Sequence, residues 1–297
     1  MSNVQDLLVE TRDGRVLKGF TSAFSSRNLL IYCHGTPFPA VPWEHLESQA
    51  RARNLKVVAW ARPGYGGSTP QPGRSVRSFS EDAEDVVASL GGDHAIALGW
   101  SGGGPHALSL GVGPRARCRA IITIGSVAPY GLDDLDWTAG MGQENIDEFA
   151  LAVQGGDAFT EFLETVMPTL GDATTEGLIE SMATLISPVD AEALSEHGLA
   201  ELFVQEGKLA SAYGIEGWRD DDGAFLKDWG FSPSEITVPV SLWQGVQDLM
   251  VPGTHGSWLA NAIPGVSAHL LEGEGHLSLA TRYLGAMLDE ACERGGL

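Results

Sequence analysis

Short hydrophobic runs recur along the first part of the chain and return near its C-terminus, separated by stretches that suit amphipathic helices. Most runs are continuous rather than alternating, which is typical of strands buried on both faces of a parallel sheet. The turn signal Asp13-Gly14 joins the first two runs as a hairpin. The predicted strands are 7–11, 16–20, 29–33, 56–60, 95–98, 120–124, 238–243 and 268–271. Their alternation with helices predicts an α/β fold with a doubly wound, mostly parallel sheet.

The pattern changes after residue 130, and no convincing strand follows until about residue 235. Ser78 and Glu81 have the spacing of a capping box at the start of the second predicted helix. The predicted helices along the chain are 43–52, 82–90, 105–110, 144–153, 158–167, 176–186, 199–213, 257–262 and 279–291. The chain therefore divides into a first core part, 1–130, a helical insertion, 131–234, and a second core part, 235–297.

Composition and charge narrow the classes of function. The chain has 297 residues, enough to bury a large core, and 43% of them are hydrophobic. Its net charge is −21 and its 18 basic residues are scattered, which argues against a nucleic-acid partner. No secretory signal and no apolar run of membrane-spanning length is recognisable in the sequence. We therefore expect a cytoplasmic protein that acts on a small molecule, with no nucleic-acid or membrane partner.

The residues that bind metals or cofactors occur in no recognisable pattern. Cys33, Cys118 and Cys292 are odd in number and far apart, as expected of reduced thiols. Nothing resembles a zinc site or a phosphate-binding loop. The acidic run 220–222 is predicted to be a solvated turn or a helix start rather than a metal site. We therefore expect no metal and no cofactor.

The strongest chemical signal is the segment Gly99-Trp100-Ser101-Gly102-Gly103, which follows the strand 95–98 and precedes a predicted helix. The pattern G-x-S-x-G between a strand and a helix is typical of a nucleophile elbow. The turn is so tight that side chains at positions 99 and 103 would collide, which requires glycine at both. The elbow predicts a strained serine whose hydroxyl is lifted above the sheet.

A serine nucleophile needs a base, and the base needs a carboxylate that orients it. Asp248 follows the strand 238–243, and His276 follows the strand 268–271. Both therefore lie in loops at the carboxyl ends of parallel strands, the edge where such sheets build their sites. Ser101, Asp248 and His276 also occur in the chain order of elbow-type hydrolases.

Four motifs give the chain its resemblance to the α/β-hydrolase family over nearly its whole length. They are His34-Gly35-Thr36-Pro37, the segment 62–68, the elbow, and the loops of Asp248 and His276. The resemblance implies an α/β-hydrolase fold with eight strands, flanking helices and a helical cap inserted after the sixth strand. It implies Ser101 as the nucleophile, His276 as general base and then acid, and Asp248 as the group that orients it. The chain is most similar to the capped esterases, proline iminopeptidases and carbon–carbon-bond hydrolases.

Backbone chemistry suggests the oxyanion hole. One donor is expected to be the N–H of Gly102, directly after the nucleophile. The second is expected from Thr36, because Pro37 has no N–H. Trp100, Phe38 and Trp137 are the candidate substrate-binding residues. Further side chains of the insertion either line a cleft or form its core: Phe162, Met167, Phe203 and Trp218.

Several residues compete for these roles. His34 and His255 are alternative bases, but His34 is expected to support its loop, and His255 stands where a helix should start. The aspartates at 133, 134 and 136 are alternatives to Asp248, although they come well after the strand that precedes them. Arg62 is expected to form a structural ion pair rather than to bind a substrate carboxylate.

The predicted activity is hydrolysis of a small carboxylic ester through an acyl-enzyme. An aminopeptidase that removes an N-terminal proline is one alternative and requires acidic groups that hold the substrate amine. The available carboxylates are Glu144, Asp147, Glu148, Glu201 and Glu206. Carbon–carbon hydrolysis or lyase chemistry on the same residues is another alternative. A non-catalytic ligand-binding protein is a further one.

Overall fold

A single eight-stranded sheet organises the chain in the order β1-β2-β4-β3-β5-β6-β7-β8. The computed structural model describes residues 4–92, 94–113, 118–182 and 184–297. The strands are β1 Val4–Glu10, β2 Val16–Ser22, β3 Asn28–Cys33, β4 Lys56–Trp60, β5 His94–Trp100, β6 Cys118–Ile124, β7 Val240–Gly245 and β8 Ser267–Leu271. The hairpin β1-β2 is antiparallel and β2 pairs antiparallel with β4, while all other neighbours are parallel. The predicted mostly parallel sheet is confirmed.

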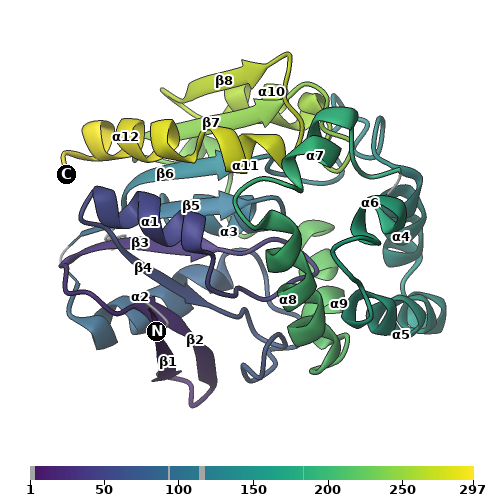
Figure 1. Cartoon of the computed structure of the whole chain (residues 1–297), viewed down its shortest axis with the longest axis horizontal. Coiled ribbons are helices and arrows are strands. Elements are labelled where there is room, and N and C mark those ends of the chain that lie inside the picture. Colours follow the sequence, from purple (N-terminus) through teal and green to yellow (C-terminus); the bar gives the residue numbers. More distant parts are fainter. Residues whose placement is uncertain (1–3, 93, 114–117, 183) are drawn as a thin grey trace.

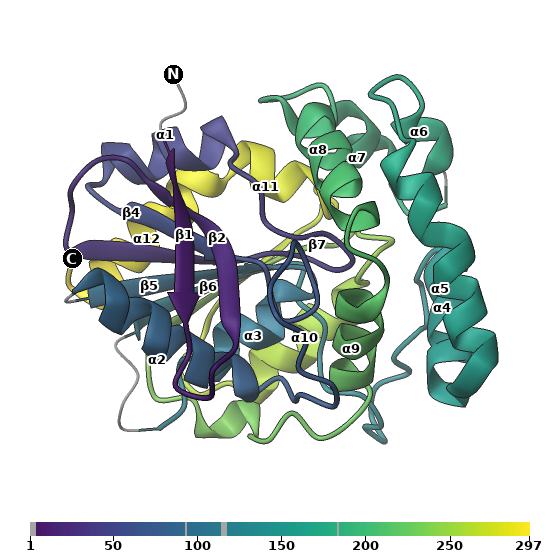
Figure 2. The same ribbon diagram turned by 90° about the horizontal axis from the view of Figure 1, so that it is seen from below.

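Helices cover both faces of this sheet, as Figures 1 and 2 show. On one face lie α1 Glu44–Ala52, α11 Ser278–Arg282 and α12 Leu284–Gly295. On the other lie α2 Ser78–Leu90, α3 Gly103–Ser109 and α10 Gly253–Ala262. Leu29 and Ile31 of β3 pack into the core on one face, whereas Leu30 and Tyr32 pack into the core on the other. Burial on both faces explains why the hydrophobic runs of the central strands are continuous.

The segment between β6 and β7 is helical throughout its regular structure in the described residues. Its helices are α4 Gln143–Gln154, α5 Gly156–Gly171, α6 Leu178–Ser181, α7 Pro188–Ala193, α8 Leu199–Ser211 and α9 Glu216–Phe225. A short 3-10 helix, Pro233–Glu235, leads back to the sheet. Figure 2 shows these helices gathered at one end of the sheet. That end is the one at which β5 runs into Ser101, because Ser101 and side chains of α4, α5, α8 and α9 line one cavity.

Some details of the helices differ from the sequence predictions. The predicted helix 176–186 is reduced to α6, and the last predicted helix is divided at Tyr283 into α11 and α12. The predicted capping box is wrong. Helix α2 begins at Ser78, and the Ser78 hydroxyl accepts the N–H of Ser75 instead. Helices α7 and α9 were not predicted. The aspartates 220–222 lie in the interior of α9, and two of them are fully buried, so the expectation of a solvated turn or a helix start is wrong.

Within the part of the chain that the structure describes, no helix is both long and apolar enough to cross a membrane.

Candidate active site

Ser101 occupies the sharp turn between β5 and α3. Its φ of +56° lies in the left-handed region, which non-glycine residues rarely adopt. A side chain at Gly99 would collide with the backbone of Gly103, and one at Gly103 would collide with the backbone of Cys33. The serine backbone is therefore held in a strained conformation by close packing on both sides, as the elbow pattern predicts.

His276 and Asp248 meet beside this turn. The distance from His276 Nδ1 to Asp248 Oδ2 is 2.7 Å, and both side chains are almost completely buried. The other oxygen of Asp248 accepts the N–H groups of Met250 at 2.9 Å and Val251 at 2.7 Å. Since Nδ1 donates to the carboxylate, Nε2 of His276 remains available as the proton acceptor of a neutral imidazole.

The charge of Asp248 also sets the proton affinity of His276. Burial by itself lowers the pKa of His276, but the charge of Asp248, its hydrogen bond and the more distant charge of Asp190 outweigh this effect. The pKa of His276 is therefore raised above the ordinary value of 6.5. A raised pKa makes the imidazole a better proton acceptor, provided that it is neutral at the working pH.

Gly125, the residue after β6, makes room for this pair. Its φ is +52°, and a Cβ placed there would come within 2.6 Å of His276 Nδ1 and 3.0 Å of Asp248 Oδ2. The loop after β6 must therefore carry a glycine at this point, because any side chain would occupy the place of the imidazole.

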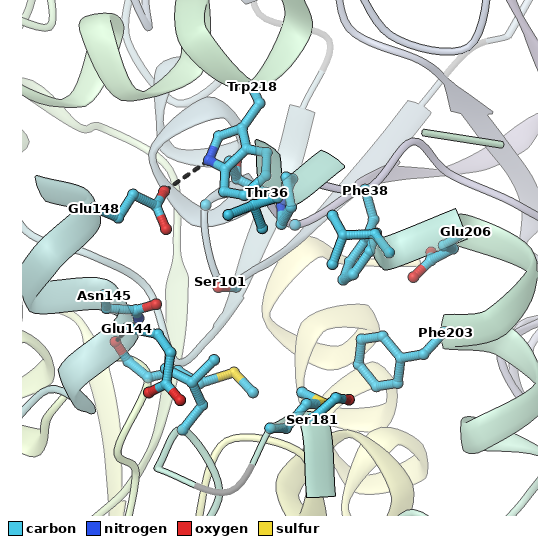
Figure 3. A pocket seen from close by; sticks show the side chains of 18 of the residues that line it. Thr36, Phe38, Ser101, Glu144, Asn145, Glu148, Ser181, Phe203, Glu206 and Trp218 are labelled. Carbon is cyan, nitrogen blue, oxygen red and sulfur yellow. Dashed lines mark hydrogen bonds between the residues drawn. The ribbon is translucent and has the colours of Figure 1, made fainter. Parts of the chain in front are cut away.

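A cavity of about 680 Å³ opens above Ser101 and is lined by Gly102, Thr36 and His276 as well. Figure 3 shows Ser101 at its base, with side chains of the helices between β6 and β7 around it. Much of the remaining lining is apolar and includes Phe38, Trp100, Met141, Phe149, Phe162, Leu178, Met182 and Phe203. Ser101, His276 and both predicted oxyanion residues thus line the same cavity.

Thr36 lies directly against Gly102. A Cβ on Gly102 would come within 2.5 Å of the Thr36 hydroxyl oxygen, so the Thr36 side chain packs closely against Gly102. The carbonyl of Gly35 accepts hydrogen bonds from Arg62 Nη2 at 3.0 Å and from His34 Nδ1 at 2.8 Å. Because C=O and N–H point in opposite directions across a trans peptide, the N–H of Thr36 faces away from the guanidinium.

The imidazoles of His34 and His255 are both hydrogen-bonded to backbone groups. His34 Nε2 accepts the N–H of Arg62 at 3.0 Å, and burial lowers the pKa of His34 well below its ordinary range. His255 accepts the N–H of Ala128 at 3.0 Å and contacts the carbonyl of Trp137 at 2.7 Å. Burial lowers the pKa of His255 to about 4. Neither imidazole lines the cavity, so neither replaces His276 as a candidate base.

Some of the candidate substrate-binding residues line the cavity, and others do not. Phe38 and Trp100 line the cavity, as do Phe162, Phe203 and Trp218. Trp137 does not line it; its indole N–H donates to the carbonyl of Ala128 at 2.7 Å and its ring packs on Phe149. Met167 is buried in the core formed by α5 and its neighbours. For Trp137 the expectation of a substrate contact is wrong, because the indole is used to fasten the loop after β6.

Arg62 is the centre of a buried network, as expected of a structural ion pair. Its guanidinium binds Asp221 of α9 and also donates to the carbonyls of His34 and Gly35. Asp221 accepts further hydrogen bonds from Thr36 Oγ1 at 2.7 Å and Tyr65 OH at 3.0 Å. Sequence reasoning missed Asp221, because an acidic run gives no sign of arginines that lie far away in the chain.

Acidic groups line the cavity on two sides. Four of the five carboxylates considered above contribute to the lining, namely Glu144, Asp147, Glu148 and Glu206, whereas Glu201 is exposed outside it. Asp222 joins them, and the described lining residues include no lysine or arginine. Figure 3 shows Glu148 and Glu206 on opposite sides of Ser101.

Glu148 and Asp222 are two buried carboxyls of the cavity lining that influence each other electrostatically. Asp222 is fully buried, and neither of its carboxylate oxygens has a hydrogen-bond partner in the described structure. Glu148 accepts the indole N–H of Trp218 at 2.7 Å (Figure 3). Burial raises the pKa of Glu148 to about 7 and that of Asp222 well above its ordinary range. Both carboxyls are therefore protonated more readily than exposed ones, and the negative charge of Glu148 adds to the rise in the pKa of Asp222.

No three of the described His, Cys, Asp and Glu side chains are grouped so that they could hold a metal ion.

Comparisons with known proteins agree with this architecture. A sequence model described as the Alpha/beta hydrolase family matches residues 30–288. The protein 3-oxoadipate enol-lactonase 1 of Acinetobacter baylyi is 24% identical over 211 residues, which cover 71% of this chain and 77% of that protein.

Two solved structures illustrate the likeness in fold. An esterase from Exiguobacterium antarcticum superposes with a TM-score of 0.64 at 15% identity, covering 97% of this chain and 99% of its own. A bromoperoxidase from Bacillus anthracis superposes with a TM-score of 0.68 at 20% identity, covering 98% and 99%. These neighbours share the fold while their names cover different reactions.

Proposed function

Because the chain belongs to the alpha/beta hydrolase family, we propose that it is a serine hydrolase that cleaves small carboxylic esters. The observation that carries the proposal is the 2.7 Å contact between His276 Nδ1 and Asp248, beside a cavity that His276 and the strained Ser101 both line. Three such residues supply what acyl transfer by serine needs: a nucleophile, a base and a group that orients the base.

In the proposed cycle, the Ser101 hydroxyl attacks the ester carbonyl while Nε2 of His276 takes its proton. The N–H groups of Gly102 and Thr36 stabilise the oxyanion, a contribution worth about 2.7–4 kcal/mol for one donor. His276 then protonates the departing alcohol, and water hydrolyses the acyl-enzyme with His276 as base again. Asp248 holds the imidazole in the required tautomer throughout.

The helices between β6 and β7 act as a cap in this proposal. Their apolar side chains line the cavity, so they select the acyl group and limit the water around Ser101. The choice of an ester agrees with two of the similar proteins, one named an enol-lactonase and the other an esterase. A lactone is itself a cyclic ester.

The proposal is tested with p-nitrophenyl esters of increasing chain length and with a fluorophosphonate probe. We expect wild-type protein to hydrolyse the esters and to be labelled at Ser101, and folded Ser101→Ala to do neither. Folded wild-type protein that is neither labelled nor active would overturn the proposal and favour a non-catalytic ligand-binding role.

The acidic lining favours an aminopeptidase as the second candidate. A protonated substrate amine beside Glu148 and Asp222 would favour the ionised form of a carboxyl whose pKa burial has raised, so an ion pair would form in place of a neutral carboxyl. Prolyl-naphthylamide and its N-acetylated form separate the two candidates. Cleavage of the free amine alone, without action on short esters, would establish the aminopeptidase. Glu148→Gln is then expected to raise KM for the amine and to leave KM for neutral esters unchanged.

A further inference from the structure

Asp190 lies in α7, within the helical segment between β6 and β7, yet its side chain reaches the loop that carries His276. Its carboxylate accepts the backbone N–H groups of His276 at 3.0 Å, Leu277 at 2.7 Å and Ser278 at 3.0 Å. The hydroxyl of Ser187 donates a fourth hydrogen bond at 3.0 Å. Asp190 itself is 0% exposed. One side chain of α7 therefore binds three consecutive residues, beginning with the candidate base.

The packing around this carboxylate leaves little freedom. A Cβ on Gly275 would overlap both carboxylate oxygens of Asp190, so the carboxylate lies flat against the loop just before His276. Helix α11 packs against α7, and Figure 1 shows the two side by side. His276 is thus held at two points, by Asp248 at the imidazole and by Asp190 at the backbone.

The charge of Asp190 has no cationic partner among the described residues. The backbone N–H groups at the start of α11 and the Ser187 hydroxyl satisfy its oxygens, but they carry no net charge. A buried carboxylate without a counter-ion acts on nearby titratable groups over a longer distance than an exposed one, because water does not screen it. The charge of Asp190 contributes to raising the pKa of the imidazole of His276.

We infer that Asp190 is a positioning residue for His276: it fixes the backbone of the base and places a second negative charge beside the imidazolium that forms during acyl transfer. The inference rests on the proposed function, in which His276 accepts the proton of Ser101. It adds to that function a link by which the helical cap orients the base.

The effect of Asp190 on His276 can be separated from the effects of the other charged groups nearby. Asp248 contacts the ring, Asp190 contacts the backbone, and Glu274 on the same loop lies 3.4 Å from Arg282. Trp100 faces the ring and carries no charge, and its indole N–H donates to the His276 carbonyl at 3.2 Å. Removing the charge of Asp190 therefore leaves Asp248 as the carboxylate that still contacts the imidazole.

Two neutral substitutions of different shape test the inference. Asp190→Asn keeps the size of the side chain, and Asp190→Ser keeps an oxygen acceptor of the kind that caps helix N-termini. In both we expect the pKa of His276, followed by NMR of the imidazole, to fall by up to about one pH unit, since a negative charge is lost. We also expect kcat for an ester to fall about tenfold with little change in KM. The control is Glu192→Gln, an exposed carboxylate of the same helix.

Two results would overturn the role inferred for Asp190. A wild-type imidazole pKa and kcat in either folded variant would overturn the inference, and so would failure of both variants to fold, which would make Asp190 purely structural. The NMR titration does not depend on turnover. If the wild-type protein cleaves no ester, the proposed function fails, and the shift in the pKa of His276 still decides the role of Asp190.

Discussion

The Arg62 guanidinium and the Asp221 carboxylate form an ion pair that is almost completely buried, with side-chain exposures of 1% and 0%. Arg62 follows β4, and Asp221 lies in α9 of the helical segment between β6 and β7. Because Arg62 also holds the carbonyls of His34 and Gly35, this pair connects the helical segment to the loop of Thr36. Arg74 adds a second contact to Asp221 at 2.7 Å.

Asp221→Asn should destabilise the protein by about 3–5 kcal/mol, because two buried arginines lose their shared counter-charge. Urea unfolding at neutral pH measures the effect. The control Glu216→Gln, on the same helix but outside this network, should change the stability by less than about 0.5 kcal/mol. Equal stability of Asp221→Asn and wild type would contradict the role of the pair.

The pH dependence of this contribution has a definite sign. Burial alone would raise the pKa of Asp221, but the charges of Arg62 and Arg74 outweigh it and hold the pKa well below 3.8. A depressed pKa stabilises the fold above the unfolded value of about 3.9, and this contribution is lost as the pH falls through the folded value. The difference in stability between wild type and Asp221→Asn should therefore be full near pH 7 and shrink in strong acid.

His276→Ala should lower kcat by about 10⁴-fold or more, as expected for the base of a serine hydrolase. His255→Ala removes an imidazole of equal size that binds backbone groups away from the cavity, so its loss of kcat should be far smaller. Ester hydrolysis by the two folded variants measures the difference. Similar losses in both would undo the assignment of His276 as base.

Gly125→Ala should lower kcat strongly while leaving the protein folded, because the added Cβ would push the imidazole of His276 away from Asp248. Gly131→Ala is the matched control, since Gly131 also has a positive φ, of +78°, but has open space around it. Both variants should lose about 1 kcal/mol of stability from backbone strain. Only the first should lose activity, and full activity in Gly125→Ala would show that the ring does not need this space.

Glu148→Gln should flatten the dependence of stability on pH between about pH 5 and 8. Burial raises the pKa of Glu148 from 4.5 to about 7, so the folded protein holds a proton that the unfolded chain has released. Stability from this group is therefore greatest below pH 4.5 and is lost as the pH rises through about 7. Chemical unfolding at several pH values measures the slope. The exposed Glu201 supplies the control, because Glu201→Gln should leave the slope of the wild type unchanged.

Much of the sheet and the order of the candidate residues could be predicted from local patterns. A strand buried on both faces is apolar at most of its positions, so β3, β4 and β6 are recognisable as nearly continuous hydrophobic runs. The elbow at Ser101 depends on residues within five positions of one another, so the glycines that it requires are visible in the sequence. Asp248 and His276 each follow a predicted strand, which places both at the same edge of the sheet.

The roles of Asp190, Asp221 and Asp222 could not be predicted in this way. In the sequence, a run of aspartates in a helical region is indistinguishable from a solvated helix face. Burial of Asp221 is favourable only because Arg62 and Arg74 come from a distant part of the chain, and burial of Asp190 only because three backbone N–H groups converge on it. For the same reason the sequence cannot show that Trp137 fastens a loop instead of lining the cavity.

The sequence by itself thus determined the strands, the elbow with Ser101 and the positions of Asp248 and His276 after their strands. These features depend on hydrophobic periodicity and on turn geometry, which act between near neighbours. Only the tertiary structure decided which carboxylates are buried and what they bind, because the partners of a buried charge are separated in the chain and meet through folding. The elbow therefore marks the candidate nucleophile in the sequence. The helices between β6 and β7 supply Asp221 and Asp190, which hold the loops of Thr36 and His276.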